Sequence, residues 1–355
     1  MTDIVQHTPV LLQEVMDQLA PQPGQWLLDA TLGHGGHAEA YLERTKPDGR
    51  VVGLDADPDA AAIARKRLES YGDRVTILNN NFANLKDSIL GGGILQRGST
   101  LTQEPPSEIL PVHQNINEGG FDHILFDLGI GSHQLADERR GFSFSGSTSL
   151  SMRYGAEDRL PAAQLDSLNK LERRLQRLPD VPEILSYLSV PEIAEILRVY
   201  GEERYALAIA RAVKEAQPAT AEALAAAVSA AVPSRYRAGR INPATRTFMA
   251  LRLAVNRELE VLQAALPQAV ELTRLGGRIA VISFHSLEDR IVKRFFREKV
   301  KGCICPPDYP VCQCGKKPSL KLVNKKPLMA TEDEQRSNPR ARSAKLRVAE
   351  KIGTG

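Results

Sequence analysis

The sequence predicts an α/β fold, a mainly parallel sheet with helices on both faces that is interrupted by a helical insertion. Apolar strands alternate with helical stretches over the first 130 residues, helical periodicity alone follows from about residue 162 to 232, and the strand pattern returns near residue 278. Such alternation is typical of doubly wound sheets, which bind ligands at the carboxyl ends of their strands.

The first part of the sheet is indicated by short apolar runs and the helices between them. The expected strands are Trp26–Ala30, Arg50–Asp55, Arg74–Leu78 and Phe121–Asp127, and the expected helices are Ala38–Arg44 and Pro58–Leu68. Proline suits the first turn of a helix, which supports a start at Pro58. Gly91–Gly120 is rich in Gly, Pro, Ser, Asn and Gln, and its lack of periodicity predicts an exposed loop.

The second part of the chain is expected to hold the insertion and the remaining strands. Apolar side chains recur at helical spacing at Ile193, Ile196, Leu197 and Tyr200, and at Leu207, Ala210 and Val213. Gly276 and Gly277 lead into an expected strand Arg278–Phe284, and an antiparallel pair is expected at Leu320–Val323 and Lys345–Val348. We therefore expect a discontinuous sheet domain of residues 1–136 and 245–355, with an inserted helical domain of residues 137–244.

Composition limits the class of protein. The chain has 355 residues, of which 42% are hydrophobic and 25% charged, which excludes wholesale disorder. Neither a membrane span nor a secretory signal is visible, so a cytoplasmic protein without membrane contact is expected. All four cysteines lie between Cys303 and Cys314, so disulfides are not expected to hold the fold together.

Basic residues gather in two stretches although the net charge is only +3. Residues 233–257 contain six arginines and no acid, and residues 316–347 contain ten Lys or Arg against three acids. Local surpluses of this size attract a phosphate backbone, but basic side chains also commonly do no more than solvate a surface. Charge alone leaves both interpretations open.

The turn after the first expected strand points to a nucleoside site. It reads Asp29-Ala30-Thr31-Leu32-Gly33-His34-Gly35-Gly36, and its glycines permit a tight turn and a close approach of backbone to a ligand. Asp55 ends the next strand, where a carboxylate can accept hydrogen bonds from ribose hydroxyls. The acid Asp29 at the start of the turn favours a cationic, methionine-bearing nucleoside over a dinucleotide pyrophosphate.

Further candidates follow other strand ends. Asp127 could bind a cofactor or substrate amine, or could cap a helix. Phe82 could stack on a base edge or belong to the core. Phe284 and His285 follow the returning strand, where they could contact a target base or a phosphate, although a histidine beside serines is more often a satisfied turn residue.

Six motifs in order resemble one family, the ribosomal RNA small subunit methyltransferase H (RsmH, or MraW) family. The motifs are His7–Leu12, Gly33–His37, Asp55–Pro58, Tyr200–Arg204, Asn242–Phe248 and Ser283–Arg290. The resemblance extends from His7 to about Arg347 and fails mainly in Gly91–Gly120. It implies a class I, Rossmann-like fold with an inserted helical domain, and S-adenosylmethionine-dependent N4-methylation of a cytidine (position 1402) of 16S rRNA in the small ribosomal subunit.

The resemblance also implies a set of site residues. Carried over by motif, the cofactor contacts are Gly36, His37, Ala38, Asp55, Phe82, Asp127 and Gln134. Asp127, Phe284 and His285 are the catalytic candidates, with Asp127 as the acceptor of a proton from the target amine. The residues expected to contact RNA are Arg240, Arg246 and Arg290.

Departures from the family pattern keep an alternative open. They lie at Gly131, His133, Ala136 and Ser151, in segments expected to border the cleft. A ribosome-assembly factor that binds the cofactor with weak or no methyl transfer is therefore one alternative, and a nicotinamide-dependent oxidoreductase on the same sheet is another. The sequence does not decide whether the chain forms a homodimer.

The cysteines form a separate candidate site. Cys303, Cys305, Cys312 and Cys314 have the pattern C-x-C-x6-C-x-C, and four thiolates could close a tetrahedral zinc site. The spacing within each pair is tighter than the usual two to four residues, and a reduced loop stiffened by prolines without metal is the alternative.

Overall fold

The structure is a computed structural model that describes residues 8–90, 120–131, 134–135, 137–144, 149–154, 160, 168–178, 180–239, 242–303, 305–306, 309–311 and 313–353. By their contacts the residues form two compact units, Met1–Gly129 with Leu262–Gly355, and Ile130–Val261. We call the first the sheet unit and the second the helical unit.

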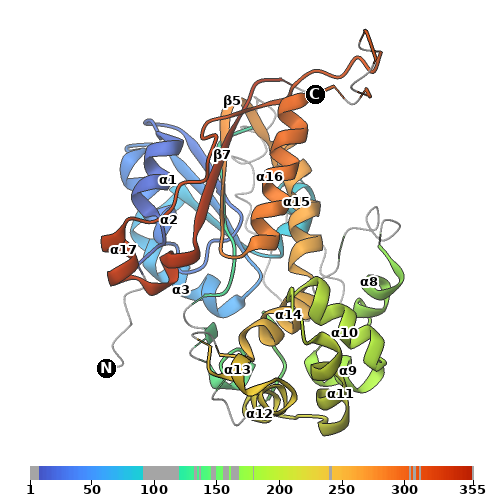
Figure 1. Ribbon diagram of the computed structural model, residues 1–355. Helices are drawn as coiled ribbons and strands as arrows, with labels where there is room; N and C mark the ends of the chain where they lie inside the picture. The colour runs from blue at the N-terminus through green and yellow to red at the C-terminus, as the bar shows by residue number, and fades with distance from the viewer. Residues whose placement is uncertain are drawn as a thin grey trace. The chain divides into compact units, whose positions relative to one another are not determined.

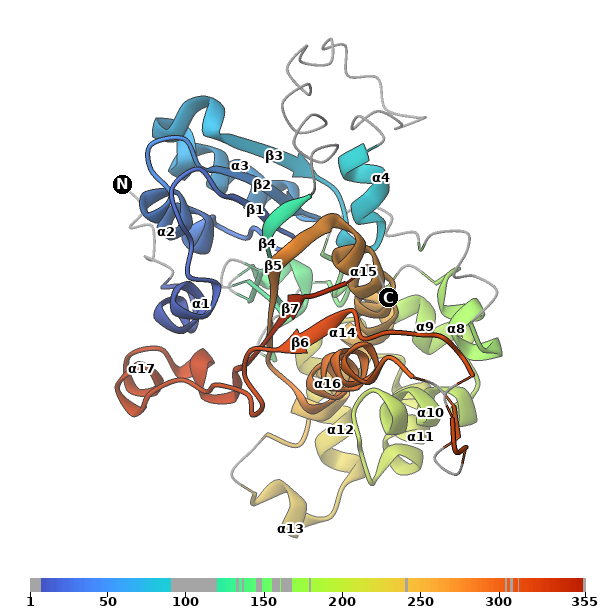
Figure 2. The ribbon, with the colours of Figure 1, turned by 90° about the horizontal axis from the view of Figure 1, so that it is seen from above.

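The sheet unit is built on seven strands in the order β3-β2-β1-β4-β5-β7-β6 (Figure 2). The strands are β1 (Trp26–Asp29), β2 (Arg50–Asp55), β3 (Val75–Asn79), β4 (Phe121–Asp127), β5 (Thr273–Ser283), β6 (Leu320–Leu322) and β7 (Lys345–Lys351). Strands β1 to β5 are parallel, whereas β7 runs antiparallel to both β5 and β6. The expected α/β sheet and its final antiparallel pair are both confirmed.

Helices cover both faces of this sheet because each face of the strands is apolar. Helices α1, α2 and α3 pack on one face, and α4, α15 and α16 on the other (Figure 1). The bounds are α1 (Leu12–Leu19), α2 (Gly36–Arg44), α3 (Pro58–Leu68), α4 (Leu85–Leu90), α15 (Glu258–Leu272), α16 (Ser286–Lys301) and α17 (Glu332–Ser337). Short 3-10 helices are η1 (Glu69–Arg74), η2 (Phe82–Asn84) and η4 (Pro339–Ser343).

The strand order places the site. From β1 the chain continues to β2 and β3 on one side, while β4 and β5 lie on the other side of β1. The carboxyl ends of β1 and β4 therefore adjoin at the point where the order reverses, and crevices at such points bind ligands in open α/β sheets. Asp29 and Asp127 are the last residues of these two strands.

The helical unit contains η3 (Glu138–Arg140), α8 (Lys170–Leu175), α9 (Val181–Tyr187), α10 (Val190–Val199), α11 (Ala206–Ala216), α12 (Ala221–Ala231), α13 (Ser234–Arg237) and α14 (Thr245–Asn256). In α10 the expected apolar positions are buried. In α11 the expectation for Leu207 is wrong, since its side chain is 45% exposed. The buried stripe of α11 is Ala206, Ile209, Ala210 and Val213, which keeps the helical spacing without Leu207.

Several boundaries differ from those expected. Helix α2 begins at Gly36 rather than Ala38, and β5 begins at Thr273 and ends before Phe284. The sequence pattern did not indicate that β5 begins before Gly276. Gly276 has a φ of 77°, and the β4–β5 register shifts beside it, as in a glycine bulge, so the alternation of the strand is interrupted there. Helix α14 packs against α10, which groups it with the helical unit, whereas residues 245–261 were expected in the sheet domain.

Two further predictions concern an exposed loop and the absence of a membrane span. The expected loop Gly91–Gly120 lies outside the described residues except for Gly120. In the described part of the chain, no helix combines the length and the apolar character that crossing a membrane requires.

Candidate functional site

The glycine turn after β1 is tied to the end of β2. Gly33 and Gly35 have φ values of 53° and 78°, a left-handed conformation that favours glycine. The Gly33 N–H donates to Asp55 Oδ2 at 2.7 Å, and the Asp57 N–H donates to Asp55 Oδ1 at 2.8 Å. Asp55 therefore lies against the turn, as expected, and its carboxylate orients the loop.

Helix α2 starts at the end of this turn without a side-chain cap. Its N-cap residue is Gly35, which has no side chain to satisfy the amides of the first turn, those of Gly36, His37 and Ala38. Amides at such a helix start, together with the helix dipole, are suited to a negatively charged group. The three predicted cofactor contacts are thus consecutive residues of the first turn of one helix.

Residue 36 is a glycine for a different structural reason from the one expected, which was the close approach of a ligand. A Cβ atom on Gly36 would lie 2.3 Å from Pro9 Cγ, so a neighbouring part of the chain already fills the space beside this glycine. The same segment contacts the next residue, since His37 Nε2 lies 3.1 Å from the carbonyl oxygen of Val10. Packing of the N-terminal segment, rather than approach of a ligand, accounts for a glycine at this position.

Asp29 is a buried carboxyl group at the end of β1. Its side chain is 1% exposed, Oδ1 accepts a hydrogen bond from the Thr31 N–H at 3.2 Å, and the buried Oδ2 has no hydrogen-bond partner among the described residues. Burial raises the pKa of Asp29 to about 7; the hydrogen bond from Thr31 lowers it, and the charge of Asp55 raises it further.

Asp127 ends β4 next to Asp29. Burial raises the pKa of its carboxyl group well above the usual value, and the negative charges of Asp29 and Glu288 add to the effect. Oδ1 is buried without a hydrogen-bond partner in the described part of the chain, although 20% of the whole side chain is accessible. Two carboxyl groups with unsatisfied oxygens thus lie at the reversal of the strand order.

His37 is the polar neighbour of Asp127. Its Nδ1 lies 3.5 Å from Asp127 Oδ2. Because the carbonyl oxygen of Val10 can only accept a hydrogen bond, His37 Nε2 must carry a hydrogen, which leaves Nδ1 facing the carboxyl group. One proton between Nδ1 and Oδ2 then satisfies both atoms, so His37 can hold a proton for Asp127.

Two aromatic rings lie beside the same strand ends. Phe82, in η2 after β3, makes an edge-to-face contact with Phe126 at 5.7 Å between ring centroids and stays partly exposed. Phe284 packs on Gly129, where a Cβ atom would come within 3.2 Å of its ring. Gly129 has a φ of 106°, so a side chain there would be both strained and crowded. Phe284, which follows β5 in the sequence, therefore lies close in space to the end of β4.

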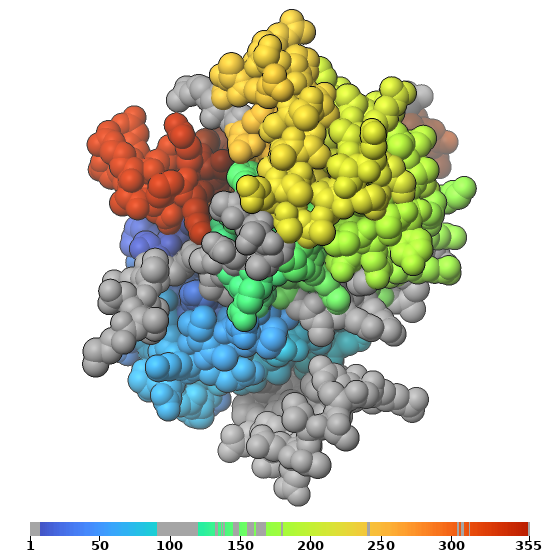
Figure 3. All heavy atoms as spheres, turned by 90° about the horizontal axis from the view of Figure 1, so that it is seen from below, coloured from blue at the N-terminus to red at the C-terminus, as the bar shows by residue number. Residues whose placement is uncertain are grey.

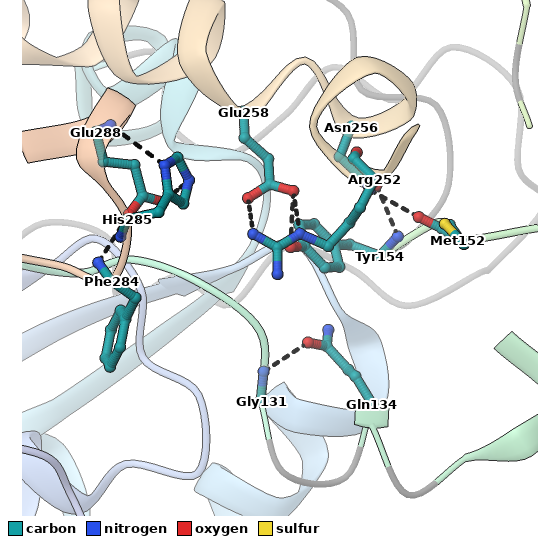
Figure 4. A network of polar contacts seen from close by, with 10 residues as sticks. All are labelled: Gly131, Gln134, Met152, Tyr154, Arg252, Asn256, Glu258, Phe284, His285 and Glu288. Carbon is teal, nitrogen blue, oxygen red and sulfur yellow. Dashed lines mark hydrogen bonds and ion pairs between the residues drawn. The ribbon is translucent and has the colours of Figure 1, made fainter. Parts of the chain in front are cut away.

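His285 caps the helix that follows β5 (Figure 4). Its Nδ1 accepts from the Glu288 N–H at 3.5 Å, and its Nε2 lies 3.1 Å from Glu288 Oε1. Glu288 in turn accepts hydrogen bonds from the backbone N–H groups of Phe284 and His285, at 2.8 and 3.3 Å. The histidine is thus a largely buried capping residue, and contact with a base or phosphate stays a prediction.

Comparison with known proteins identifies the family. The profile of the MraW methylase family matches residues 4–352. A ribosomal RNA small subunit methyltransferase H from Heliobacterium modesticaldum is 45% identical, with 98% of this chain and 99% of that protein covered. One from Dehalococcoides mccartyi is 44% identical over 98% of this chain and 86% of that protein. This chain belongs to the MraW methylase family.

The comparison with solved structures found a protein of low sequence identity. The rRNA methylase from Streptococcus thermophilus is 9% identical, covers 98% of this chain and 99% of its own, and has a TM-score of 0.39.

In this family member the helical unit holds one further predicted cofactor contact, Gln134. Its side chain is 6% exposed, and Oε1 accepts a hydrogen bond from the Gly131 N–H at 2.8 Å (Figure 4). Of the four positions that depart from the family's sequence pattern, Gly131 and Ser151 lie among the described residues. The other two, His133 and Ala136, lie outside them.

A second network in the helical unit fixes the segment around Met152 (Figure 4). Met152 has a left-handed φ of 56°, which is costly for a residue with a side chain. Asn256 Nδ2 donates to the Met152 carbonyl oxygen at 2.7 Å, and Asn256 Oδ1 accepts from the Tyr154 N–H at 3.0 Å. Arg252 and Glu258 form two hydrogen bonds, at 2.8 and 3.1 Å, and Glu258 also accepts from the Tyr154 hydroxyl.

Arg246 belongs to a basic and aromatic surface of the helical unit. The Arg204 guanidinium lies over the rings of Tyr205 and Tyr236, at 5.0 and 4.8 Å from their centroids. Arg246 is exposed and donates to the carbonyl oxygen of Glu202 at 3.1 Å. Tyr236 lies in α13, which is visible in gold at the surface in Figure 3. The other expected contact in this region, Arg240, lies outside the described residues.

Arg290 begins a basic stripe on α16. Arg290, Arg294, Arg297 and Lys301 are exposed, and their spacing of four, three and four residues places them on one side of the helix. Glu298 is the exposed acid beside them, so the stripe is not neutralised residue by residue. A charged helix face of this kind is suited to phosphate, and equally to solvent.

Three residues that hold segments of the two units in place were not anticipated. Thr31 accepts a hydrogen bond from the Asp127 N–H at 2.6 Å, Glu288 pins the turn after β5, and Asn256 holds the segment at Met152. Glu288 could have been found, because a glutamate three residues after a capping residue is typical of a capping box. Thr31 and Asn256 act over long sequence separations, which no local pattern signals.

The raised pKa of Asp29 predicts a pH-dependent cost to stability. The unfolded chain loses this proton near pH 3.8, but the folded chain keeps it up to about pH 7. Stability contributed by the protonated form is therefore lost as pH rises between these values. The neutral variant Asp29→Asn keeps the acceptor for Thr31, so it should unfold at the same temperature as wild type near pH 4. It should gain up to about 4 kcal/mol above pH 7.

Thermal unfolding of the ligand-free protein at several pH values measures this difference. Asp57→Asn is a control, because Asp57 is a buried helix cap of α3 rather than a member of the carboxyl pair. An Asp29→Asn difference that stays constant from pH 4 to pH 8 would contradict the shifted pKa.

The contact between Gly36 and Pro9 predicts a rescue. Gly36→Ala should lower the melting temperature, because overpacking of a filled site costs about 1–3 kcal/mol. Pro9→Ala removes Cγ and Cδ, so the double variant should regain most of the loss. Thermal unfolding tests both variants, and an unchanged melting temperature in Gly36→Ala would refute the packing explanation.

Proposed function

We propose that this chain is an S-adenosylmethionine-dependent methyltransferase that N4-methylates a cytidine, position 1402, of 16S rRNA in the small ribosomal subunit, acting in the cytoplasm. One observation carries the cofactor assignment: two buried carboxyl groups, Asp29 and Asp127, adjoin at the reversal of the strand order with unsatisfied oxygens. A cation is a partner that such a pair can bind when its carboxyl groups are ionised. Membership of the MraW methylase family and the names of the relatives support the RNA substrate.

The residues of the sheet unit fit the parts of this cofactor. The uncapped amides at the start of α2, from Gly36 to Ala38, suit a carboxylate. Asp55, which accepts hydrogen bonds from the N–H groups of Gly33 and Asp57, ends β2, where a carboxylate can bind ribose hydroxyls. Phe82 presents a partly exposed ring next to β4, suited to a flat base. The role of Gln134, in the helical unit, as a cofactor contact stays a prediction.

Bound S-adenosylmethionine supplies a methyl group that is already activated by a sulfonium. The chain therefore has to orient the target and accept a proton, rather than supply a covalent nucleophile. The exocyclic amine of cytosine is a weak nucleophile, because its lone pair is delocalised into the ring. In its ionised form, which a bound cation favours, Asp127 is positioned to accept a hydrogen bond from that amine at Oδ1 and to take up its proton, with His37 at Oδ2.

Two surfaces support RNA as the substrate. In the helical unit, Arg204 and Arg246 lie with Tyr205 and Tyr236, which combines cations for phosphates with rings on which bases can stack. In the sheet unit, Arg290 begins the basic stripe of α16. The target base must leave its stack to reach the methyl group, so we expect it to be presented in an unpaired or flipped form.

Mass spectrometry of 16S rRNA fragments tests this function. A strain lacking the gene should lose one methyl group on one cytidine, and expression of the wild-type chain should restore it. Purified chain with S-adenosylmethionine should also methylate small subunits from that strain. Unchanged methylation in the deletion strain would favour the assembly-factor alternative. Thermal stabilisation by NAD rather than by S-adenosylmethionine would favour the oxidoreductase.

Asparagine variants separate cofactor binding from proton transfer. Asp29→Asn should weaken S-adenosylmethionine binding more than S-adenosylhomocysteine binding, because only the former carries a sulfonium charge. Asp127→Asn should lower turnover at saturating cofactor by 10²- to 10⁴-fold, the range for loss of a general base.

Calorimetry and steady-state kinetics provide the two readouts. Normal turnover of Asp127→Asn at saturating cofactor, with only affinity lost, would eliminate the proton-accepting role. Equal losses of affinity for both compounds in Asp29→Asn would show that the carboxyl group does not recognise charge.

A further inference from the structure

Three cysteine thiols meet at the end of α16, far from the proposed cofactor site. The sulfur atoms of Cys303, Cys305 and Cys314 all lie within 4.8 Å of one another, and Cys303 Sγ and Cys314 Sγ are 3.7 Å apart. A tetrahedral zinc ion with Zn–S bonds of 2.3 Å places its sulfurs about 3.8 Å apart. The distance between Cys303 and Cys314 matches this edge, and it is much longer than the S–S bond of a disulfide.

The backbone around the thiols holds the sulfur atoms in place. The Gln313 N–H donates to Cys305 Sγ at 3.3 Å, which fixes the position of that sulfur. Gly315, directly after Cys314, has a left-handed φ of 65°, which turns the chain sharply behind the sulfur. Lys316 and Lys317 follow and are exposed, so their charges offset those of a thiolate cluster.

The loop that carries the cysteines is closed at its base but has little apolar support. Gly302 lies so close to the returning chain that a Cβ would meet Pro318 N at 2.5 Å, and the Ser319 N–H donates to the Lys299 carbonyl oxygen at 3.0 Å. Within the loop, the described apolar side chains Tyr309 and Val311 are 49% and 71% exposed. Small segments without a core of their own are commonly stapled by a metal or disulfides.

We propose that Cys303, Cys305 and Cys314 bind a structural Zn²⁺ ion. Soft thiolates select zinc among the common divalent ions. Cys312, the remaining cysteine of the sequence pattern, lies outside the described residues. The 16 residues of α16 span about 24 Å, so the zinc lies at the opposite end of that helix from Phe284 and His285. A closed site at this distance holds the loop (at the top of Figure 1) and takes no part in methyl transfer.

Metal analysis of the full chain, purified without chelators, tests the proposal. We expect one zinc ion per chain, and we expect the thiols of Cys303, Cys305 and Cys314 to react with a thiol reagent only after the metal is removed. Replacement of zinc by Co²⁺ should give the intense thiolate-to-metal charge-transfer bands of a tetrahedral thiolate site. Zinc near background, or a disulfide in freshly purified reduced protein, would overturn the proposal.

Matched variants identify the ligands. Cys303→Ser, Cys305→Ser and Cys314→Ser should each lose most of the zinc, while S-adenosylmethionine affinity shows that the sheet unit remains folded. Gln313→Pro removes the donor to Cys305 and should release zinc to a chelator several-fold faster than Gln313→Ala, which keeps it. Equal release from these two variants would contradict the role of that hydrogen bond.

Discussion

The site depends on the burial of two like charges at one point of the sheet. Asp29 and Asp127 end neighbouring strands, burial opposes both charges, and the charge of Asp29 raises the pKa of Asp127 further. The strand order brings these two strand ends together, because β1 and β4 adjoin where the topology reverses. Ionisation of these buried carboxyl groups therefore destabilises the folded chain, and a bound cation can offset that cost. The site thereby favours positively charged ligands.

The remainder of the sheet unit serves to hold that pair in place. Thr31 binds the backbone of Asp127, Asp55 orients the glycine turn, and His37 faces the second oxygen of Asp127. His37 is itself fixed by Val10, so the N-terminal segment reaches the site through one hydrogen bond. Glu288 plays the same part after β5, where it binds two consecutive amides. Rigid elements thus position each polar group.

Local sequence predicted the elements well where one chemical signal dominated. β2, α3 and β4 have the expected bounds, because uninterrupted apolar runs and a proline at a helix start leave little choice. The glycine turn and Asp55 could also be placed together, since both follow the ends of adjacent parallel strands. These features depend on short stretches of chain.

Features that depend on residues far apart in the sequence could not be predicted from local sequence patterns. The pKa of Asp29 depends on burial and on Asp55, and the reason for Gly36 is Pro9, on another segment. Asn256 satisfies Met152 across more than a hundred residues. The beginning of β5 was missed because a glycine bulge interrupts its pattern, and Leu207 was misplaced because alanines can line a packed helix face as well as leucine.

The position of β7 has a consequence for synthesis. β5, which leads into Phe284 and His285, is covered on its open side by a strand that the ribosome makes only after α16, the cysteine loop and β6. Until residues up to Lys351 emerge, β5 presents a bare row of amides and carbonyls to the cell. A nascent chain of this enzyme thus has an exposed sheet edge for longer than one whose strands are made in spatial order, and it gains a working site only late in translation.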